Sequence, residues 1–180
     1  MKIGIFGGSF NPPHIMHKKI ALDLINAKYL DKVIYVPTGN KYNKKNLIDV
    51  KYRIEMLRLM CDNNCLQVSD YEIKNNLVYT YQTLDYFKIK YSNDEIYFIC
   101  GSDNIKQIYT WKNYEYILNN YKILVVLRNN DKNIDIQKHN NIIVTNIRID
   151  DLSSTSLRNN LDELNLDKKV YNYIKQEKLY

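Results

Sequence analysis

The sequence has few cysteines, glycines and prolines, and it has no long apolar run. Only three cysteines, five glycines and three prolines occur among its 180 residues. No stretch approaches the roughly 20 apolar residues of a membrane-spanning helix, and no charged-then-apolar leader is evident. We therefore expect no membrane association and no export, and we predict a cytoplasmic protein.

The cysteines do not form the pattern of a disulfide framework or of a zinc site. Cys61, Cys65 and Cys100 are odd in number, and disulfides are rare in proteins that are not exported. Cys61 and Cys65 have no histidine neighbours and lack the spacing of zinc ligands. We expect three reduced thiols.

Basic residues outnumber acidic ones, 26 to 20, which gives a formal net charge of +6. Such a balance suits nucleic-acid binding or the attraction of small polyanions. The local clusters, at Lys41, Lys44 and Lys45 and at Lys168 and Lys169, can also be solvated surface. Because no recognised nucleic-acid motif accompanies them, we predict small anionic substrates and no nucleic-acid partner.

Short apolar runs alternate with longer amphipathic stretches along the chain. Strands are expected at 2–7, 32–37, 66–68, 95–100, 122–127 and 141–144, with an acidic turn at 69–72. Helices are expected at 15–28, 49–61, 79–91, around 111 and 116, at 155–161 and at 167–178. This alternation predicts βαβ units and a doubly wound parallel α/β sheet. We predict one domain, residues 1–180, that ends in two helices.

Several residues that could bind a ligand come directly after predicted strands. They are Gly7 and Gly8, Thr38, Gly101 and Arg128. Ligands of open parallel sheets bind beyond the carboxyl ends of the strands, where the strand order reverses. These residues are therefore expected to line one cleft.

The stretch GGSFNPPHIMH joins the first predicted strand to the first helix. Its glycines let backbone N–H groups approach a ligand, and a helix start favours anions. His14 and His17, at i and i+3, share one helical face. Both imidazoles could donate hydrogen bonds to a triphosphate and to the charge that develops on leaving pyrophosphate.

The two histidines could instead be metal ligands. No third ligand at a suitable spacing is evident nearby. The remaining histidine, His139, stands alone in a polar stretch and is expected to be structural or at the surface. We predict phosphate contact and no protein-bound metal.

Four further features each allow two interpretations. The stretch LSSTSLR, residues 152–158, can be an ordinary Ser/Thr helix cap, or its hydroxyls and Arg158 can bind phosphates. Asp103 can cap a helix or contact a nucleotide, and Arg128 can form a surface ion pair or bind phosphate. Trp111, the only tryptophan, can be a packing residue or can stack on an electron-poor ring.

Two of these stretches resemble the signatures of a known family. GGSFNPPHIMH resembles the GG(S/T)F(D/N)PxHxGH signature of the nucleotidylyltransferase superfamily, in particular of the bacterial nicotinate-mononucleotide adenylyltransferases. LSSTSLR resembles the ISSTxxR signature of the same family. Residues 78–84 resemble the family's SYTxxTL segment. Two places depart from the family pattern: Met16 stands where the first signature has glycine, and residues 37–44 replace a PPHK-like loop.

The resemblance implies a Rossmann-like fold and a set of site residues. It implies catalytic roles for His14, His17 and Arg158. It implies ATP contacts by Gly7, Gly8, Ser9, Phe10, Gly101, Asp103, Ser153, Ser154 and Thr155. It implies contacts to the acceptor by Thr38, Lys41, Lys44, Tyr79, Thr80, Trp111 and Arg128.

The resemblance also implies the reaction. ATP would adenylylate nicotinate mononucleotide to give nicotinate adenine dinucleotide and pyrophosphate, a step of NAD biosynthesis, with Mg²⁺ carried by ATP. The alternatives are a related transferase that acts on nicotinamide mononucleotide or pantetheine phosphate or that uses CTP, and a nucleotide sensor without catalysis. A homo-oligomer is compatible with all of these.

Overall fold

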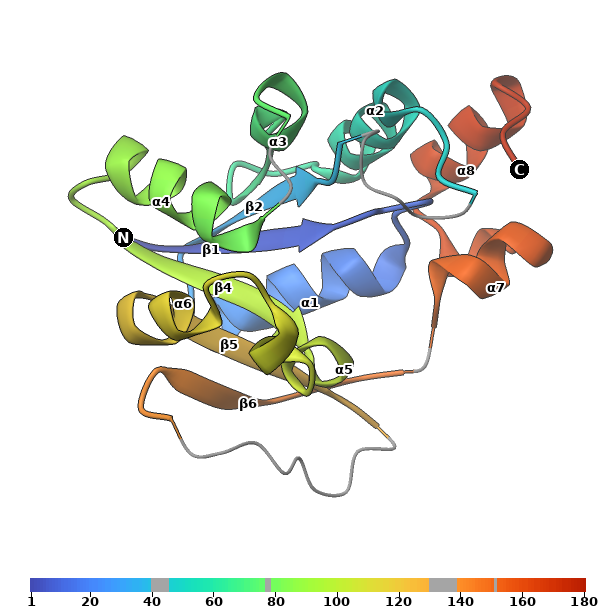
Figure 1. The fold of residues 1–180 in the computed structure, drawn as a ribbon. Helices are drawn as coiled ribbons and strands as arrows, with labels where there is room; N and C mark the ends of the chain where they lie inside the picture. Colours follow the sequence, from blue (N-terminus) through green and yellow to red (C-terminus); the bar gives the residue numbers. More distant parts are fainter. Residues whose placement is uncertain (40–45, 77–78, 130–138, 151) are drawn as a thin grey trace.

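The computed structural model describes residues 1–39, 46–76, 79–129, 139–150 and 152–180, which form one six-stranded sheet with helices on both faces (Figure 1). All pairings are parallel, and the strand order is β3-β2-β1-β4-β5-β6. The strands are β1 (Lys2–Gly8), β2 (Lys32–Pro37), β3 (Leu66–Val68), β4 (Glu95–Gly101), β5 (Lys122–Arg128) and β6 (Ile142–Ile149). This order reverses between β1 and β4 and confirms the predicted doubly wound α/β class.

The helices mostly follow the predicted ones. They are α1 (Ile15–Asn26), α2 (Val50–Met60), α3 (Tyr71–Lys74), α4 (Thr80–Lys90), α5 (Ser102–Ile105), α6 (Tyr114–Asn120), α7 (Ser154–Asn159) and α8 (Lys168–Gln176), with short 3₁₀ helices η1 (Ile108–Thr110) and η2 (Glu163–Asn165). The predicted turn at 69–72 is wrong in part, because α3 begins inside it. There the amides of Ile73 and Lys74 both donate to the carbonyl of Asp70, which starts a helical turn.

The last strand is longer than predicted. β6 continues to Ile149, and its second half alternates buried and exposed residues. Thr145, Ile147 and Ile149 face inward, whereas Asn146 and Arg148 are exposed. β6 is an edge strand, so polar residues are tolerated on one side. This alternation hid the strand from a search for continuous apolar runs.

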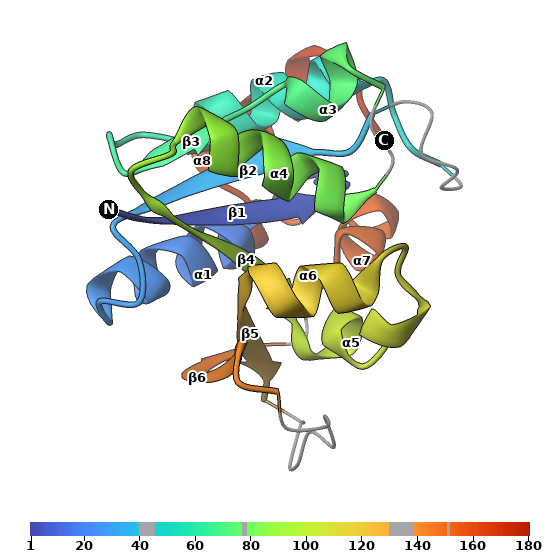
Figure 2. The same cartoon turned by 60° about the vertical axis from the view of Figure 1, so that its left-hand side comes forward.

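The sheet separates two hydrophobic cores, and successive apolar residues of the central strands β2, β4 and β5 enter opposite cores. Tyr35 packs in the core that holds buried residues of α1, α2 and α8, while Ile34 and Val36 pack in the core with α4, α5 and α6. Figure 2 shows α4 and α6 side by side over the second face. β1 is therefore covered on both faces, which fixes the position of its carboxyl end.

Among the described residues, no helix combines the length and the apolar character that crossing a bilayer requires. All three cysteines are free thiols.

Candidate active site

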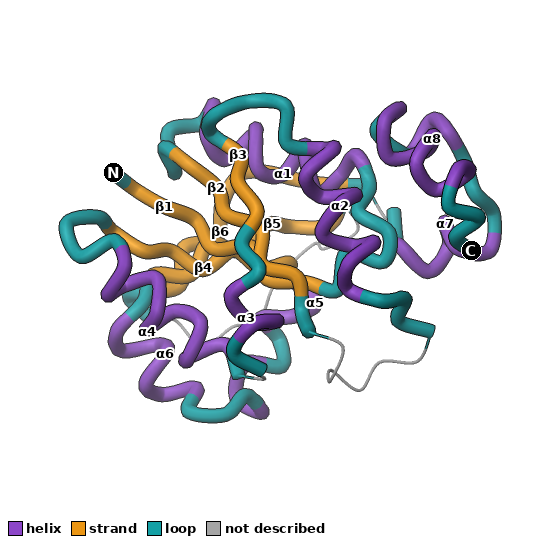
Figure 3. Tube along the Cα trace, turned by 90° about the horizontal axis from the view of Figure 1, so that it is seen from above, coloured by secondary structure: helices purple, strands orange, loops and turns teal. Residues whose placement is uncertain are grey.

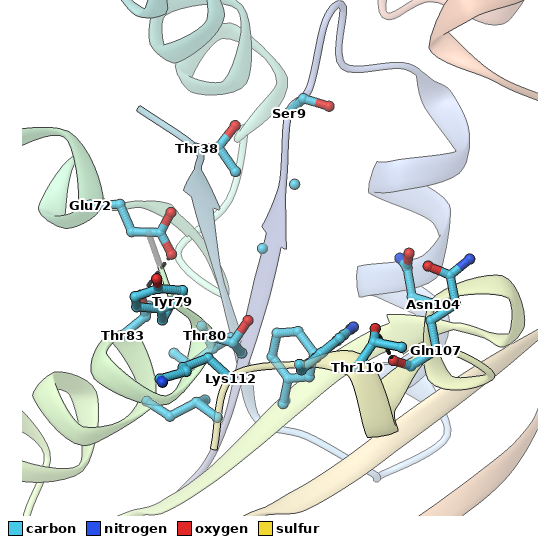
Figure 4. Close-up of a pocket in the computed structure, with 16 residues that line it drawn as sticks. Ser9, Thr38, Glu72, Tyr79, Thr80, Thr83, Asn104, Gln107, Thr110 and Lys112 are labelled. Atoms are coloured by element: carbon cyan, nitrogen blue, oxygen red, sulfur yellow. Dashed lines mark hydrogen bonds between the residues drawn. The ribbon is translucent and has the colours of Figure 1, made fainter. Parts of the chain in front are cut away.

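A pocket of about 540 Å³ opens where β1 and β2 end (Figure 4). Its floor comes from Gly7, Gly8, Ser9 and Thr38 at the ends of these strands. Figure 4 shows two opposite walls, one with Glu72, Thr80 and Thr83 and the other with Asn104, Gln107 and Thr110. The pocket thus lies at the carboxyl edge of the sheet, as expected for a doubly wound fold.

Seven residues predicted to bind ATP or its acceptor line this one pocket: Gly7, Gly8, Ser9, Thr38, Tyr79, Thr80 and Trp111. Trp111 is half-buried, and Phe98 packs against it edge-on, with ring centroids 5.6 Å apart. This contact fixes the orientation of the indole in the wall. The hydroxyl of Thr38 is buried and has no hydrogen-bond partner among the described residues.

Several lining residues were not predicted from the sequence, and Glu72 is the most unusual of them. Its carboxylate accepts a hydrogen bond of 2.6 Å from the Thr83 hydroxyl, and burial raises its pKa to about 7. It lies in α3, where a solvated turn was expected. The other missed polar residues are Thr83, Asn104, Gln107, Thr110 and Lys112. Their types and spacing carry no signature that separates them from surface residues.

His14 and His17 stack at the start of α1, with ring centroids 3.8 Å apart. The His14 amide donates to Nδ1 of His17 at 3.1 Å. A neutral His17 therefore carries its proton on Nε2 and presents an N–H donor there. Nδ1 of His14 is buried and has no partner among the described residues.

Both imidazoles are held neutral. Burial, helped by the charge of Arg128, lowers the pKa of His14 to about 4. Burial, followed by the neighbouring His14, lowers the pKa of His17 well below its usual range. At neutral pH the pair is therefore a set of N–H donors rather than two cations.

The His14 pKa predicts how stability depends on pH. The folded state binds the His14 proton only near pH 4, whereas the unfolded chain binds it near 6.5. Stability therefore falls as the pH drops from 6.5 to 4, by about 3 kcal/mol from this residue. The free energy of unfolding of His14→Gln, measured by urea denaturation, should therefore fall by about 3 kcal/mol less than that of wild type between pH 6.5 and pH 4.

The comparison with His14→Gln is needed because Glu72 changes the pH dependence of stability in the opposite direction. Its folded pKa of about 7 lies above its usual 4.5, so its contribution to stability falls as the pH rises between these values. Both proteins share this term, and their difference isolates His14. Equal pH slopes for the two proteins would show that His14 is not buried as described.

The serine-rich stretch docks directly onto the histidine-bearing loop. The Ser154 hydroxyl donates to the carbonyl of Pro12 at 2.9 Å, and the Arg158 guanidinium donates to the carbonyl of Asn11 at 2.7 Å. Ser153 is the N-cap of α7, and its hydroxyl accepts from the Ser156 amide. The two stretches that were each predicted to contact phosphate therefore lie against each other.

Arg158 also organises its own helix. Its guanidinium donates to the Thr155 hydroxyl at 3.0 Å and to the Ser154 carbonyl at 3.2 Å. Together with the bond to Asn11, these contacts hold the cation beside the loop. Arg158 and Thr155 do not line the pocket described above. The phosphate site predicted for them would therefore lie beside this pocket and not in it.

Asp103 and Arg128 pair with each other. Arg128 Nη2 and Asp103 Oδ2 are 3.1 Å apart. A Cβ at Gly101 would come within 2.5 Å of the Asp103 carboxylate, so only glycine leaves room for this arrangement. Arg128, predicted to bind the acceptor, does not line the pocket at the ends of β1 and β2. Its charge acts on His14 instead, which groups it with the histidine pair.

Phe10, Lys41 and Lys44 were also predicted to be site residues. The side chain of Phe10 is buried and packs edge-on against His17, with centroids 5.0 Å apart, so only its backbone can face a nucleotide. Phe10 has a φ of 46°, a left-handed conformation that is strained for a bulky residue. Lys41 and Lys44 lie outside the described residues.

Arg53 is a fully buried cation that ties the pocket floor together. Its guanidinium donates to three main-chain carbonyls: Ser9 at 2.8 Å, Thr38 at 2.7 Å and Ile48 at 3.0 Å. Sequence reasoning missed it, because an arginine in an amphipathic helix normally lies on the solvated face.

The donor set gives no support to the metal alternative for the histidines. Within the part of the chain that the structure describes, no three His, Cys, Asp or Glu residues are placed to hold a metal ion.

Comparison with known proteins identifies the family. The cytidylyltransferase-like family model matches residues 5–160. A probable nicotinate-nucleotide adenylyltransferase of Endomicrobium trichonymphae is 37% identical, covering 99% of this chain and 98% of that protein. One from Fusobacterium nucleatum is also 37% identical, covering 98% of each chain. The chain belongs to the nicotinate-nucleotide adenylyltransferase family.

Solved structures share the fold of this family member. The Plasmodium falciparum nicotinic acid mononucleotide adenylyltransferase, complexed with NaAD, superposes with a TM-score of 0.81 at 21% identity, covering 99% of this chain and 97% of that one. A putative nicotinate-nucleotide adenylyltransferase from Vibrio parahaemolyticus gives a TM-score of 0.70 at 23% identity, covering 98% of this chain and 93% of that one.

Proposed function

We propose that this adenylyltransferase transfers the adenylyl group of ATP to nicotinate mononucleotide, releasing nicotinate adenine dinucleotide and pyrophosphate. The names of its relatives support this reaction. The observation that carries it is the contact of the His14–His17 loop with the Ser153–Arg158 stretch, beside a pocket walled by Trp111. Triphosphate and acceptor can thereby lie next to each other at the end of β1.

The chemistry needs no covalent intermediate with the protein. The acceptor phosphate is ionised at neutral pH, and one of its oxygens attacks the α-phosphorus of ATP while the bond to pyrophosphate breaks. The chain's part is to align two polyanions and stabilise the developing charge. The Nε2–H of His17 suits the leaving phosphates, and Arg158 and Arg128 add positive charge nearby.

Magnesium fits this scheme as part of the substrate. No acidic cluster among the described residues is arranged to hold it, and Mg²⁺ commonly keeps phosphate and water ligands. When bound, it would neutralise charge on the triphosphate. We propose that it arrives with ATP.

The same proposal covers the rest of the protein. Residues 1–180 act as one domain in the cytoplasm, with ATP and nicotinate mononucleotide as partners and without nucleic acid. Size-exclusion chromatography with light scattering tests the homo-oligomer.

An acceptor panel tests the proposed reaction. Purified protein, ATP and Mg²⁺ are incubated with nicotinate mononucleotide, nicotinamide mononucleotide or pantetheine phosphate, and pyrophosphate and the dinucleotide product are measured. We expect the highest kcat/KM with nicotinate mononucleotide. Product with pantetheine phosphate alone would identify a different transferase, and ATP binding without pyrophosphate release would indicate a sensor.

Trp111→Ala is expected to raise the KM for the pyridine nucleotide by about tenfold, with the KM for ATP little changed. An aromatic face against a charged ring contributes about 1–2 kcal/mol. Trp111→Phe, which keeps an aromatic face, should recover part of the loss. Steady-state kinetics with each substrate varied in turn measures both values, and an equal rise in both would indicate a packing role.

A further inference from the structure

The C-terminal segment, Asp167–Tyr180, lies against the outer side of the molecule and reaches back to the start of α1. It contains α8, which packs on α2, and Figure 3 shows both at the same end of the fold, beside α7. Its two ends contact residues on either side of the His14–His17 pair.

One end of the segment bonds to Asn11. The Tyr180 hydroxyl donates to Asn11 Oδ1 at 2.8 Å. Burial raises the pKa of this phenol, which therefore keeps the proton it donates. Asn11 is only 2% exposed and precedes the histidines in the same loop.

Asn11 also receives contacts from two other parts of the chain. Its Oδ1 accepts from the Ile48 amide at 3.3 Å, and its Nδ2 donates to the Asn46 carbonyl at 2.8 Å. Its own carbonyl accepts from Arg158 at 2.7 Å. Asn11 thus connects the loop to three separate segments.

The other end of the segment is held through Lys18, the residue after His17. Lys18 Nζ lies 3.3 Å from Asp167 Oδ2 and 2.7 Å from Asp62 Oδ2. The second oxygen of Asp167 accepts from the Lys169 amide at 3.0 Å and so caps α8. Asp167 therefore joins the start of α8 to the histidine-bearing helix.

We infer that Tyr180 is a positioning residue for adenylyl transfer: its hydroxyl holds Asn11, and thereby the loop that presents His14 and His17 to the triphosphate. This inference rests on the proposed function. Preorganised donors act only if they are already aimed at the developing charge, and displacements of about 1 Å can cost about a hundredfold in rate. Tyr180 touches the loop and not the acceptor pocket, so its effect should fall on turnover.

Tyr180→Phe tests the inference by removing one hydroxyl. We expect kcat to fall about tenfold because the donor pair is partly misaligned, with the KM for nicotinate mononucleotide unchanged within about twofold. Tyr171→Phe is the matched control. It removes a hydroxyl from the same segment, and this hydroxyl makes no hydrogen bond among the described residues. The variant should leave both constants and the Tm unchanged.

Asp167→Asn tests the contact at the other end of the segment independently. Asparagine keeps the helix cap but removes the charge that pairs with Lys18, so a smaller loss of kcat is expected. An unchanged kcat in Tyr180→Phe would overturn the inference. So would a lower Tm with kcat intact, which indicates a structural role alone. Absence of dinucleotide with wild type would instead overturn the proposed function.

Discussion

Replacing His17 with alanine is expected to lower kcat by about a hundredfold or more, as does the loss of one preorganised donor to a transition state. The structure gives the physical reason. His17 Nδ1 is occupied by the His14 amide, so its remaining N–H has one fixed direction. Its pKa is held low by burial, so it contributes a directed hydrogen bond before substrate arrives. Single-turnover kinetics with saturating ATP measures the effect on the chemical step.

Two variants make this test selective. His17→Gln places an amide N–H near the same position and should recover part of the lost rate. His139→Ala is the matched control, because His139 precedes β6 at the opposite, amino edge of the sheet and its Nδ1 only accepts from Asn141. A wild-type kcat in His17→Ala would contradict the assigned role.

Replacing Arg53 with leucine is expected to lower the free energy of unfolding by about 3 kcal/mol or more. Three partly buried carbonyls, those of Ser9, Thr38 and Ile48, would lose their donor. Each buried acceptor left unsatisfied costs about 1–3 kcal/mol, and the loss of the cation itself offsets part of the sum. Urea denaturation followed by circular dichroism measures the difference.

Arg58→Leu on the same helix is the control for this variant. The Arg58 side chain is 60% exposed and pairs only loosely with Glu55, at 3.6 Å, so its removal should change stability by less than about 0.5 kcal/mol. Arg53→Lys should fall between the two, because one ammonium cannot reach three carbonyls. Equal stabilities for Arg53→Leu and Arg58→Leu would show that the buried bonds contribute nothing.

The fold could be predicted where a strand is buried on both faces or a helix is amphipathic. β4 and β5 are continuously apolar, and that pattern identified them as central strands. β6 and α3 were predicted incompletely for a common reason. Each exposes one side to solvent, and short polar runs there resemble loops and turns. The local hydrophobic pattern thus identifies the central elements better than those at the edge or the surface.

The site could be predicted only as far as local motifs reach. The glycine turn, the histidine pair and the Ser/Arg stretch are each contiguous in sequence, and their assignment to one site followed from the family resemblance and not from the spacing. Arg53, Glu72 and Tyr180 were missed because their environments come from segments distant along the chain. Nothing near Tyr180 in sequence announces that its hydroxyl meets Asn11, 169 positions away.

That long separation has a consequence for biosynthesis. Ser154 and Pro12, which join the two phosphate-side stretches, are 142 positions apart, and β1 pairs with β4 rather than with a sequence neighbour alone. Parallel pairings of such high contact order form slowly, and domains fold as units during translation. A nascent chain that still lacks α7 would therefore carry both histidines without the helix that contacts their loop. Most of the polypeptide must be synthesised before this enzyme can become active.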